Sequence, residues 1–390
     1  MTAWTAVRDA LLVLAAAPFA YYLLAIFAAR RFFAARPDDA PDFTPPVSIL
    51  KPIHGLDRET YDNYASFCRQ DYAQFEILFC VTDNADPAIP VIEKIIRDFP
   101  GRPIRLLVGS EPVGASDKVS KLCRMAREAR HDFLIVSDSD VRVEPGFLRA
   151  VVAPFRDSRV GGVTCLYRGL TDGSFAAGLE ALGNSTDFAP GVLVAWQLGD
   201  GKLDFMLGAV MATTKKYLAE IGGFESLADF FSDDYELGNR IAARGHRIEL
   251  SRFPVDIVYP RETLAAAFRH QLRWNLSIRY SRPWGHLGLL FTHGLVWSLL
   301  GMLLAPSWPA VFAFTGGYCL LRYEMALAVG VRGMRDPLVR RSLWMLPLRD
   351  AFAFAVWLAS FFPQRIHWRD RQFHVRDKRL VPIPPPRARC

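Results

Sequence analysis

The hydrophobic pattern divides the chain into an apolar N-terminal run, a long region of short alternating elements, and an apolar C-terminal third. The first run, residues 10–29, is uncharged and long enough to cross a bilayer. A cleaved signal peptide would have a shorter apolar core behind a cationic start. Arg30, Arg31 and Arg36 follow the run, so the positive-inside rule places the next residues in the cytosol. The pattern predicts a transmembrane anchor over 1–36.

Short apolar runs alternate with amphipathic stretches through residues 37–262, after a linker rich in Pro and Asp. We expect strands at 47–53, 75–83, 104–109, 132–140, 161–169 and 206–214, and helices at 57–70, 87–99 and 116–130. This alternation is typical of an α/β domain with a mostly parallel sheet and helices on both faces. Ligands of such sheets bind beyond the carboxyl ends of the strands. The stretch 184–200 has an apolar middle that fits either a lipid entry or a buried core segment equally well.

The pattern of apolar and polar residues changes again after residue 262. Residues 263–286 mix apolar side chains with arginines and tryptophans, which predicts an amphipathic helix lying in the membrane interface. Two further spanning candidates follow at 287–305 and 310–331. Arg322 and Glu324 lie in the second, where we expect them to face protein as a pair.

The last apolar stretch, 343–363, completes a predicted region of membrane helices over 287–363 but poses a conflict. If it spans the bilayer, the basic tail 364–390 lies outside, against the positive-inside rule. Arg349 and Asp350 also interrupt the stretch. An in-plane or re-entrant segment is slightly favoured, and the number of spans and the side of the tail stay open.

Composition adds a basic excess, with a net charge of +7, and six cysteines without metal-ligand spacing. The cysteines lie mostly in apolar runs, which favours free thiols in a reducing compartment. Basic residues beside apolar tracts indicate a membrane surface rather than nucleic acid as the partner. The richness in Ala, Arg and Pro weakly suggests a bacterium, in which case the membrane is the inner one.

Candidate chemistry begins with the acids at strand ends. The run 134-LIVSDSDVRV-143 is an apolar strand that ends in D-x-D, so Asp138 and Asp140 can place two carboxylates on one divalent cation bound to a diphosphate. A D-x-D phosphatase of the haloacid dehalogenase class is the alternative, but it has Thr or Val where this chain has Arg142. Asp83 follows another strand, and Lys118 is a candidate phosphate contact. Taken singly, Asp83 fits an Asx turn and Lys118 an ordinary surface lysine.

A second acidic feature is the adjacent pair Asp233 and Asp234 at the start of a predicted helix. The start of a helix explains the pair in part, because Ser232 is a good N-cap residue and acids in a first turn complement the helix dipole. The two like charges also repel, which raises the pKa of one of them. The dipole opposes that shift, so no net direction follows from the sequence.

Taken in order, these features resemble the ceramide glucosyltransferase family (glycosyltransferase family 21), a membrane branch of the GT-A glycosyltransferases. The family pattern is three separated aspartates followed by (Q/R)-x-x-R-W. Here it is matched by 75-FEILFCVTDNADPA-88, 137-SDSDVRV-143, 233-DDYELGNRIAARG-245 and 273-RW-274. The resemblance runs from the N-terminal anchor through about residue 380. The run 163-VTCLYRG-169 and the His-x-x-Arg-Trp spelling are closer to bacterial relatives that glycosylate hopanoid lipids.

The resemblance implies roles for the matching aspartates. Asp83 would hold the uracil or ribose of the nucleotide, and Asp138 would bind Mg²⁺ or Mn²⁺ on the diphosphate. Asp140 is a less certain second ligand. Asp234 would be the general base, and Asp233 is a cap, a tuner of its pKa or an acceptor contact.

The same resemblance places Arg273 and Trp274 near the diphosphate and the acceptor sugar site. His270 stands where the family has Gln or Arg, which leaves its contact to phosphate open.

Together these residues predict an inverting, metal-dependent hexosyltransferase that moves a sugar from a UDP-sugar to the hydroxyl of a membrane lipid. Glucose transfer to ceramide is the first expectation, and N-acetylglucosamine transfer to a hopanoid polyol is the alternative within the family. A processive polysaccharide synthase would need Gln at position 270 and more spanning helices. A non-catalytic scaffold would leave the ordered acids unexplained, and the phosphatase would release phosphate without any sugar nucleotide.

Overall fold

The computed structural model describes residues 3–35, 42–362, 366–368 and 371–383. Residues 37–41 of the predicted linker lie outside these residues, as do Arg36 and the tail residues Arg365, Arg369, Arg387 and Arg389. The chain forms two compact units. We call them the sheet unit (36–167, 199–260 and 364–390) and the helical unit (1–35, 168–198 and 261–363), and describe each by itself.

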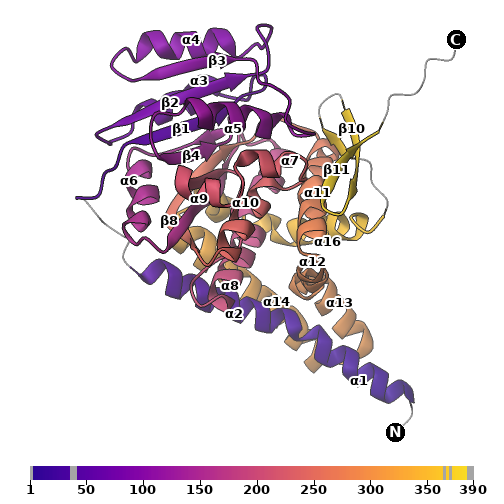
Figure 1. The fold of residues 1–390 in the computed structure, drawn as a ribbon. Coiled ribbons are helices and arrows are strands. Elements are labelled where there is room, and N and C mark those ends of the chain that lie inside the picture. The colour runs from indigo at the N-terminus through magenta and orange to yellow at the C-terminus, as the bar shows by residue number, and fades with distance from the viewer. Residues whose placement is uncertain (1–2, 36–41, 363–365, 369–370, 384–390) are drawn as a thin grey trace, which may run out of the picture. The chain divides into compact units, whose positions relative to one another are not determined.

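The sheet unit is built on an eight-stranded sheet in the order β3-β2-β1-β4-β7-β6-β8-β5 (Figure 1). Neighbours run parallel from β3 to β4, whereas the pairs β4–β7, β7–β6 and β8–β5 are antiparallel. The predicted parallel arrangement therefore holds for one half of the sheet. The strands are β1 (Val47–Pro52), β2 (Phe75–Val81), β3 (Ile104–Val108), β4 (Phe133–Ser137), β5 (Val141–Arg142), β6 (Val160–Leu170), β7 (Val210–Thr214) and β8 (Arg247–Val258).

All six predicted strands are present, and β8 is the long strand that the sequence analysis missed. Pro254 and several charged residues interrupt its apolar character. Its signal was alternation, because Ile248, Leu250 and Val255 are buried. The helices of the unit are α3 (Thr60–Cys68), α4 (Ile89–Asp98), α5 (Asp117–Glu128), α6 (Phe147–Val152), α9 (Lys215–Glu220) and α10 (Asp233–Ala243). The three predicted helices correspond to α3, α4 and α5.

The basic tail forms a small antiparallel sheet in the order β11-β10-β9. Its strands are β9 (Ile366–Trp368), β10 (Arg371–Arg376) and β11 (Arg379–Pro382), drawn in yellow in Figure 1. Asp377 and Lys378 make the two-residue turn between β10 and β11 with φ of 50° and 64°. Positive φ at both central residues matches the right-handed twist of a hairpin. Sequence analysis described this segment only as basic.

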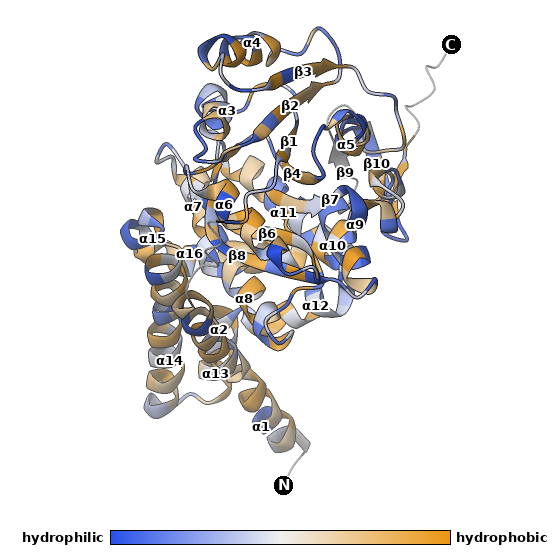
Figure 2. Cartoon of the chain, turned by 60° about the vertical axis from the view of Figure 1, so that its left-hand side comes forward, coloured by the Kyte–Doolittle hydropathy of each residue, from blue (hydrophilic) through white to orange (hydrophobic). Residues whose placement is uncertain are grey.

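The helical unit contains α1 (Ala3–Ala15), α2 (Ala17–Ala34), α7 (Phe175–Gly183), α8 (Ala189–Leu198), α11 (Leu264–Ser281), α12 (Pro283–Gly288), α13 (Gly294–Leu304), α14 (Trp308–Ala326), α15 (Pro337–Ser342) and α16 (Leu346–Ala359). Within it α13 packs against α14, and α2 packs against α8 and α14. Figure 2 shows the apolar character of these helices. The middle of the stretch 184–200 lies in α8 with Ala189 and Leu193 fully buried, so the core-segment interpretation holds.

Two helical stretches of the described residues, Trp4–Ala34 and Pro337–Ala359, are long and apolar enough to cross a membrane. The first agrees with the predicted anchor. The second contains most of 343–363, where an in-plane segment was slightly favoured. The predicted span 287–305 is not one straight helix, because the chain bends by 57° between Pro283–Thr292 and Gly294–Leu304. The helix α14, the other predicted span, is not among those that are long and apolar enough.

The expected pairing of Arg322 with Glu324 is wrong. Side chains two residues apart on a helix point about 200° apart around its axis. Arg322 is buried and bonds Asp350 at 2.6 Å and Asp187 at 2.7 Å. Glu324 instead pairs with Arg30 at 3.0 Å, and also with Arg332. The prediction that Arg322 faces protein is confirmed.

Candidate active site

The predicted acids lie at one edge of the sheet. Asp83 follows β2 by two residues and Asp138 directly follows β4. Both strands flank β1 and run parallel to it, so their carboxyl ends meet at the same edge. This confirms the edge that the sequence indicated, which is where ligands bind in open α/β sheets.

Lys118 joins two of these acids. It lies in the first turn of α5, and its Nζ is 2.8 Å from Asp138 Oδ1 and 3.6 Å from Asp233 Oδ2. Burial opposes the charge of Lys118, but Asp138 and Asp233 outweigh burial and raise its pKa. The lysine predicted as a phosphate contact is therefore a cation held among carboxylates. The Asp233 carboxylate is buried, and this lysine compensates its charge.

Asp234 has a different environment from its neighbour. Its Oδ1 accepts the backbone N–H of Tyr235 at 2.8 Å. Burial and the charge of Asp233 raise the pKa of Asp234 to about 6, while Lys118 and the Tyr235 amide act in the opposite direction. The competition that the sequence left undecided thus ends in a raised pKa. Ser232 occupies the N-cap position, but its side chain makes no capping hydrogen bond.

A glycine lies beside both functional carboxylates. A Cβ at Gly208 would be 3.1 Å from Asp234 Oδ2 and 3.8 Å from Asp138 Oδ2. The predicted base and the predicted cation ligand therefore approach the same point.

The donor set fits a divalent cation in its chemistry. Burial, Asp138 and Asp57 raise the pKa of Asp140 to about 7, and the positive charge of Lys51 offsets them only in part. Mg²⁺ and Mn²⁺ prefer carboxylate oxygens and share them with substrate phosphates. Among the described residues no group of three or more His, Cys, Asp or Glu side chains forms a complete metal site. Asp138, with Asp140 as the second candidate, would hold a cation whose other ligands come from a diphosphate.

Three residues of this region escaped the sequence analysis. Lys51 is wholly buried in β1, donates to the Asp138 carbonyl at 2.8 Å, and has a pKa lowered to about 7 by burial. Burial also raises the pKa of Asp57. Asp86 accepts the backbone N–H of Gly55 and so fixes the loop that carries Asp57. The sequence did contain a signal for Lys51, namely a lysine inside an apolar strand. A buried lysine needs a polar or charged partner.

Asp83 itself is exposed and accepts the backbone N–H of Ala85 at 2.8 Å. This is the Asx turn that the sequence suggested, and it leaves the nucleotide role of Asp83 a prediction. Arg142, which departs from the phosphatase pattern, bonds Glu59 at 2.8 Å and Asn63 at 2.9 Å.

His270, Arg273 and Trp274 lie on α11 in the helical unit. His270 Nδ1 is 2.6 Å from the fully buried Glu180, and its ring contacts Trp274 with centroids 5.0 Å apart. Glu180 also accepts a hydrogen bond from Gln271 at 3.0 Å. His270 therefore has a partner within its own unit, and the expected contacts of all three residues with the nucleotide stay predictions.

Two curated proteins of Caenorhabditis elegans are similar to this chain in sequence. Ceramide glucosyltransferase 1 of Caenorhabditis elegans is 30% identical over 236 residues, which are 60% of this chain and 50% of that protein. Ceramide glucosyltransferase 3 of the same organism is 25% identical over 347 residues, 85% of this chain and 73% of that one. The matched region thus spans half of the first relative and about three quarters of the second.

Among solved structures, the mannosyltransferase PcManGT from Pyrobaculum calidifontis, in complex with GDP-Man and Mn²⁺, superposes with a TM-score of 0.60. The identity is 18%, and the match covers 91% of this chain and 99% of that chain. This likeness confirms a GT-A-like α/β fold. The sequence model of Glycosyl transferase family 21 matches residues 10–381, almost the whole chain. The protein is thus a glycosyltransferase that belongs to family 21 and is related at low identity to ceramide glucosyltransferases.

Proposed function

We propose that this protein is an inverting, divalent-cation-dependent hexosyltransferase that moves a sugar from a UDP-sugar to a hydroxyl group of a membrane lipid. The observation that carries the proposal is the pair Asp234 and Asp138, which face Gly208 together while the pKa of Asp234 is raised to about 6. Glucose transfer to ceramide is the first candidate, because the curated relatives are ceramide glucosyltransferases.

Asp234 suits the base of such a reaction. Attack by a lipid hydroxyl on the anomeric carbon requires a group that takes the proton as the new bond forms. Inversion requires this group on the face opposite the leaving diphosphate. A carboxylate with a pKa near 6 is ionised at neutral pH, yet is a stronger base than an ordinary aspartate.

Asp138 and Lys118 serve the leaving group in this proposal. A bound cation supplies charge that stabilises the UDP product as the sugar–phosphate bond breaks. Asp138, with Asp140 as the second candidate, would hold that cation. The Lys118 ammonium lies 2.8 Å from Asp138 and 3.6 Å from Asp233, where it offsets part of their negative charge. Arg273 and Trp274 are proposed for the diphosphate and acceptor side, as the family pattern implies.

A membrane lipid as acceptor is supported by the two apolar helical stretches, which suggest membrane anchoring. The proposed arrangement has a cytosolic sheet unit, a soluble UDP-sugar and a bilayer-bound acceptor. The acceptor itself is proposed as ceramide or a hopanoid polyol.

The test is sugar transfer by detergent-purified protein with Mg²⁺ or Mn²⁺. UDP-glucose and UDP-N-acetylglucosamine are each offered with ceramide, a hopanoid polyol and diacylglycerol. We expect one pair to give a β-linked glycolipid, and EDTA and Asp234→Asn to abolish it. An α-linked product would overturn inversion, and a product insensitive to EDTA would overturn the cation. The absence of product from every pair would overturn the proposed donor and acceptor classes.

A further inference from the structure

The C-terminal hairpin, β10 and β11 with their turn (residues 371–382), bonds to a segment near the proposed base. The Leu380 amide donates to the Asp229 carbonyl at 2.8 Å, and the Phe231 amide donates to the Lys378 carbonyl at 3.0 Å. These two hydrogen bonds add the hairpin as a strand beside residues 228–231, here called the base loop. Asp234 follows the base loop directly, after Ser232 and Asp233.

Side chains of the hairpin hold the same region. Lys378 Nζ is 3.5 Å from Glu236 Oε1 and lies 5.4 Å from the centre of the Tyr235 ring. Tyr235 and Glu236 are the two residues after Asp234, so the first turn of α10 is held from outside. The Arg379 guanidinium lies 5.1 Å from the centre of the Phe230 ring in the base loop. The Glu236 carboxylate is buried and also pairs with Arg240 at 3.3 Å, whereas the Lys378 side chain is 42% exposed.

The other side of the base loop is bonded to the start of α5. The Ser116 amide donates to the Ala228 carbonyl at 2.9 Å, and the Ala115 amide donates to Asp229 Oδ1 at 3.0 Å. Ser116 also caps α5 by accepting from Val119 at 3.3 Å. Lys118 lies in that first turn, so the base loop joins the segment that positions Lys118 to the hairpin.

Nothing in the mechanism above uses the hairpin, yet its contacts continue into the turn that carries both acids. Backbone hydrogen bonds to neighbouring segments restrict the geometry of a short loop. The base loop has such bonds to α5 on one side and to the hairpin on the other.

We propose that the C-terminal hairpin positions the catalytic turn Ser232–Tyr235, with Lys378 as the positioning residue. This rests on the proposed function only where Asp234 is taken as the base. The hairpin contacts no reacting atom in this account. It holds the backbone so that Asp234 and Asp138 face the same point, and displacement of a catalytic group by about 1 Å is enough to cost about a hundredfold in rate.

The test compares Lys378→Ala, Lys378→Arg and the control Arg376→Ala in the full-length protein. Arg376 lies on the same hairpin and is mostly exposed, and it pairs with Asp377 in the turn rather than with the base loop. We expect Lys378→Ala to lower kcat about tenfold while the KM for the UDP-sugar changes less than twofold. Lys378→Arg should restore most of kcat, and Arg376→Ala should resemble the wild type.

A second measurement does not depend on activity. Hydrogen–deuterium exchange of the peptide covering 226–237 should be faster in Lys378→Ala than in the wild type and in Arg376→Ala. Truncation before residue 371 should increase exchange there further. Unchanged exchange in Lys378→Ala and in the truncated chain would overturn the positioning role even if sugar transfer is observed. Faster exchange in a protein that transfers no sugar would uphold the hairpin contact and refute the proposed function alone.

Discussion

At the level of single residues, burial and neighbouring charge give the Asp233 and Asp234 carboxyl groups different electrostatic environments. Asp233 has Lys118 as its cation, whereas burial and Asp233 raise the pKa of Asp234 to about 6. The sequence shows only that two acids are adjacent. The pairing of Asp233 with Lys118 cannot be seen in the sequence, because Lys118 lies more than a hundred residues away in the chain and is brought close only by folding.

The first prediction concerns pH. Asp234 acts as a base only when ionised, so kcat should fall below a pH of about 6, by about tenfold per pH unit. The pH profile of kcat, measured with saturating UDP-sugar and cation, shows this decrease as its acid limb. Asp234→Asn should lower kcat by about 10²- to 10⁴-fold at every pH and remove the limb. An acid limb that persists in this variant would assign it to another group.

The second prediction concerns Gly208. In Gly208→Ala the new methyl group lies against the Asp234 carboxylate at 3.1 Å and must displace it. We expect kcat to fall between about tenfold and a hundredfold, with little change in thermal stability. Gly101→Ala is the matched control, because a Cβ there meets nothing within 4 Å. Equal activities of the two variants would contradict the placement of Asp234.

Sequence reasoning identified the site residues that belong to a recognisable motif. It missed the residues whose role depends only on where folding places them. Asp83, Asp138 and Asp234 follow from the family pattern, and their strand and helix ends were found as expected. Lys51 and Asp57 belong to no such pattern. Their importance comes from burial beside Asp138 and Asp140, and burial is a property of the folded chain.

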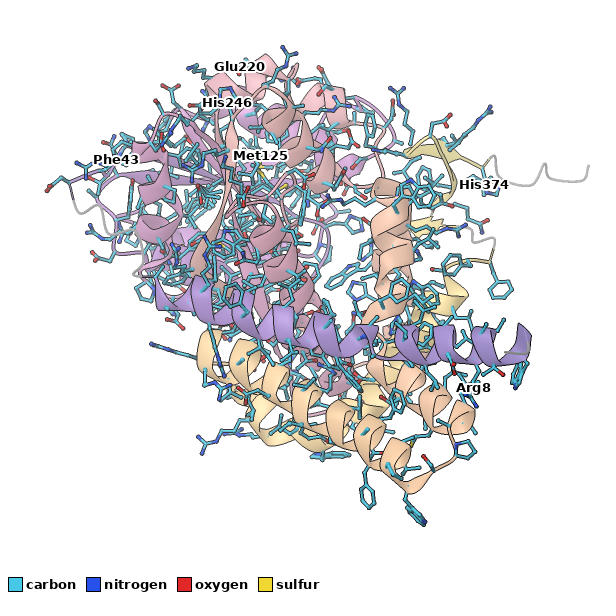
Figure 3. All side chains as sticks on the ribbon, turned by 90° about the horizontal axis from the view of Figure 1, so that it is seen from below. Arg8, Phe43, Met125, Glu220, His246 and His374 are labelled. Atoms are coloured by element: carbon cyan, nitrogen blue, oxygen red, sulfur yellow. The ribbon has the colours of Figure 1, made fainter. Side chains whose placement is uncertain are left out.

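At the level of elements, short apolar strands were predictable because both faces of β1 and β2 are covered. The hairpin was not, because its charged residues read as a solvated tail and its turn uses Asp and Lys rather than Asn-Gly. His246 and Glu220, a pair outside the site, likewise could not be predicted from the sequence. The two meet at 2.6 Å across 26 residues of sequence (Figure 3).

The third prediction concerns the ion pairs of α14. Arg322 is 2% exposed and bonds two carboxylates, Asp350 and Asp187. Arg322→Ala leaves Asp350 without its cation, while Asp187 keeps Arg349 at 2.6 Å, and the cost of breaking the buried pair is about 3–5 kcal/mol in stability. Thermal unfolding in detergent should show a markedly lower midpoint. The control is Arg30→Ala, whose exposed pair should contribute at most about 1 kcal/mol.

The fourth prediction concerns Glu262 and Glu180 of the helical unit. Burial and the neighbouring Glu180 raise the pKa of Glu262 to about 8, so the folded pair keeps a proton that the unfolded chain loses above its ordinary pKa of 4.5. The folded state therefore binds more protons, and stability falls as pH rises from about 5 towards 8. Glu262→Gln should flatten this part of the dependence of the unfolding midpoint on pH. A wild-type slope unchanged in the variant would contradict the shared proton.

At the level of the whole molecule, the hydrogen bonds between the C-terminal hairpin and the base loop decide a question that charge alone left open. Segments that share hydrogen bonds lie on one side of a bilayer. The tail is therefore on the side of the sheet unit. If the apolar region 261–363 is inserted in a bilayer, as proposed, it then crosses the bilayer an even number of times or only enters it. This agrees with the positive-inside rule for the tail, and the bend at residues 292–294 suits an entering segment.

The fifth prediction tests this topology. A cysteine introduced at the exposed Asn84 and a tag placed after residue 390 should react with impermeant reagents from the same side of sealed vesicles. A cysteine introduced at Arg8, before the predicted span, should react from the other side. Reaction of Asn84→Cys and the tag from opposite sides would contradict the hairpin contact.

The position of the hairpin in the sequence has a consequence for biosynthesis. The ribosome makes the base loop early and the hairpin only after the whole apolar region 261–363. During synthesis the catalytic turn therefore exists without the strand that holds it. In the arrangement proposed here, the enzyme gains its full rate only once the apolar region has been inserted and the hairpin has returned to the sheet unit. On the proposed function, a half-inserted chain would therefore transfer sugar more slowly than the completed protein.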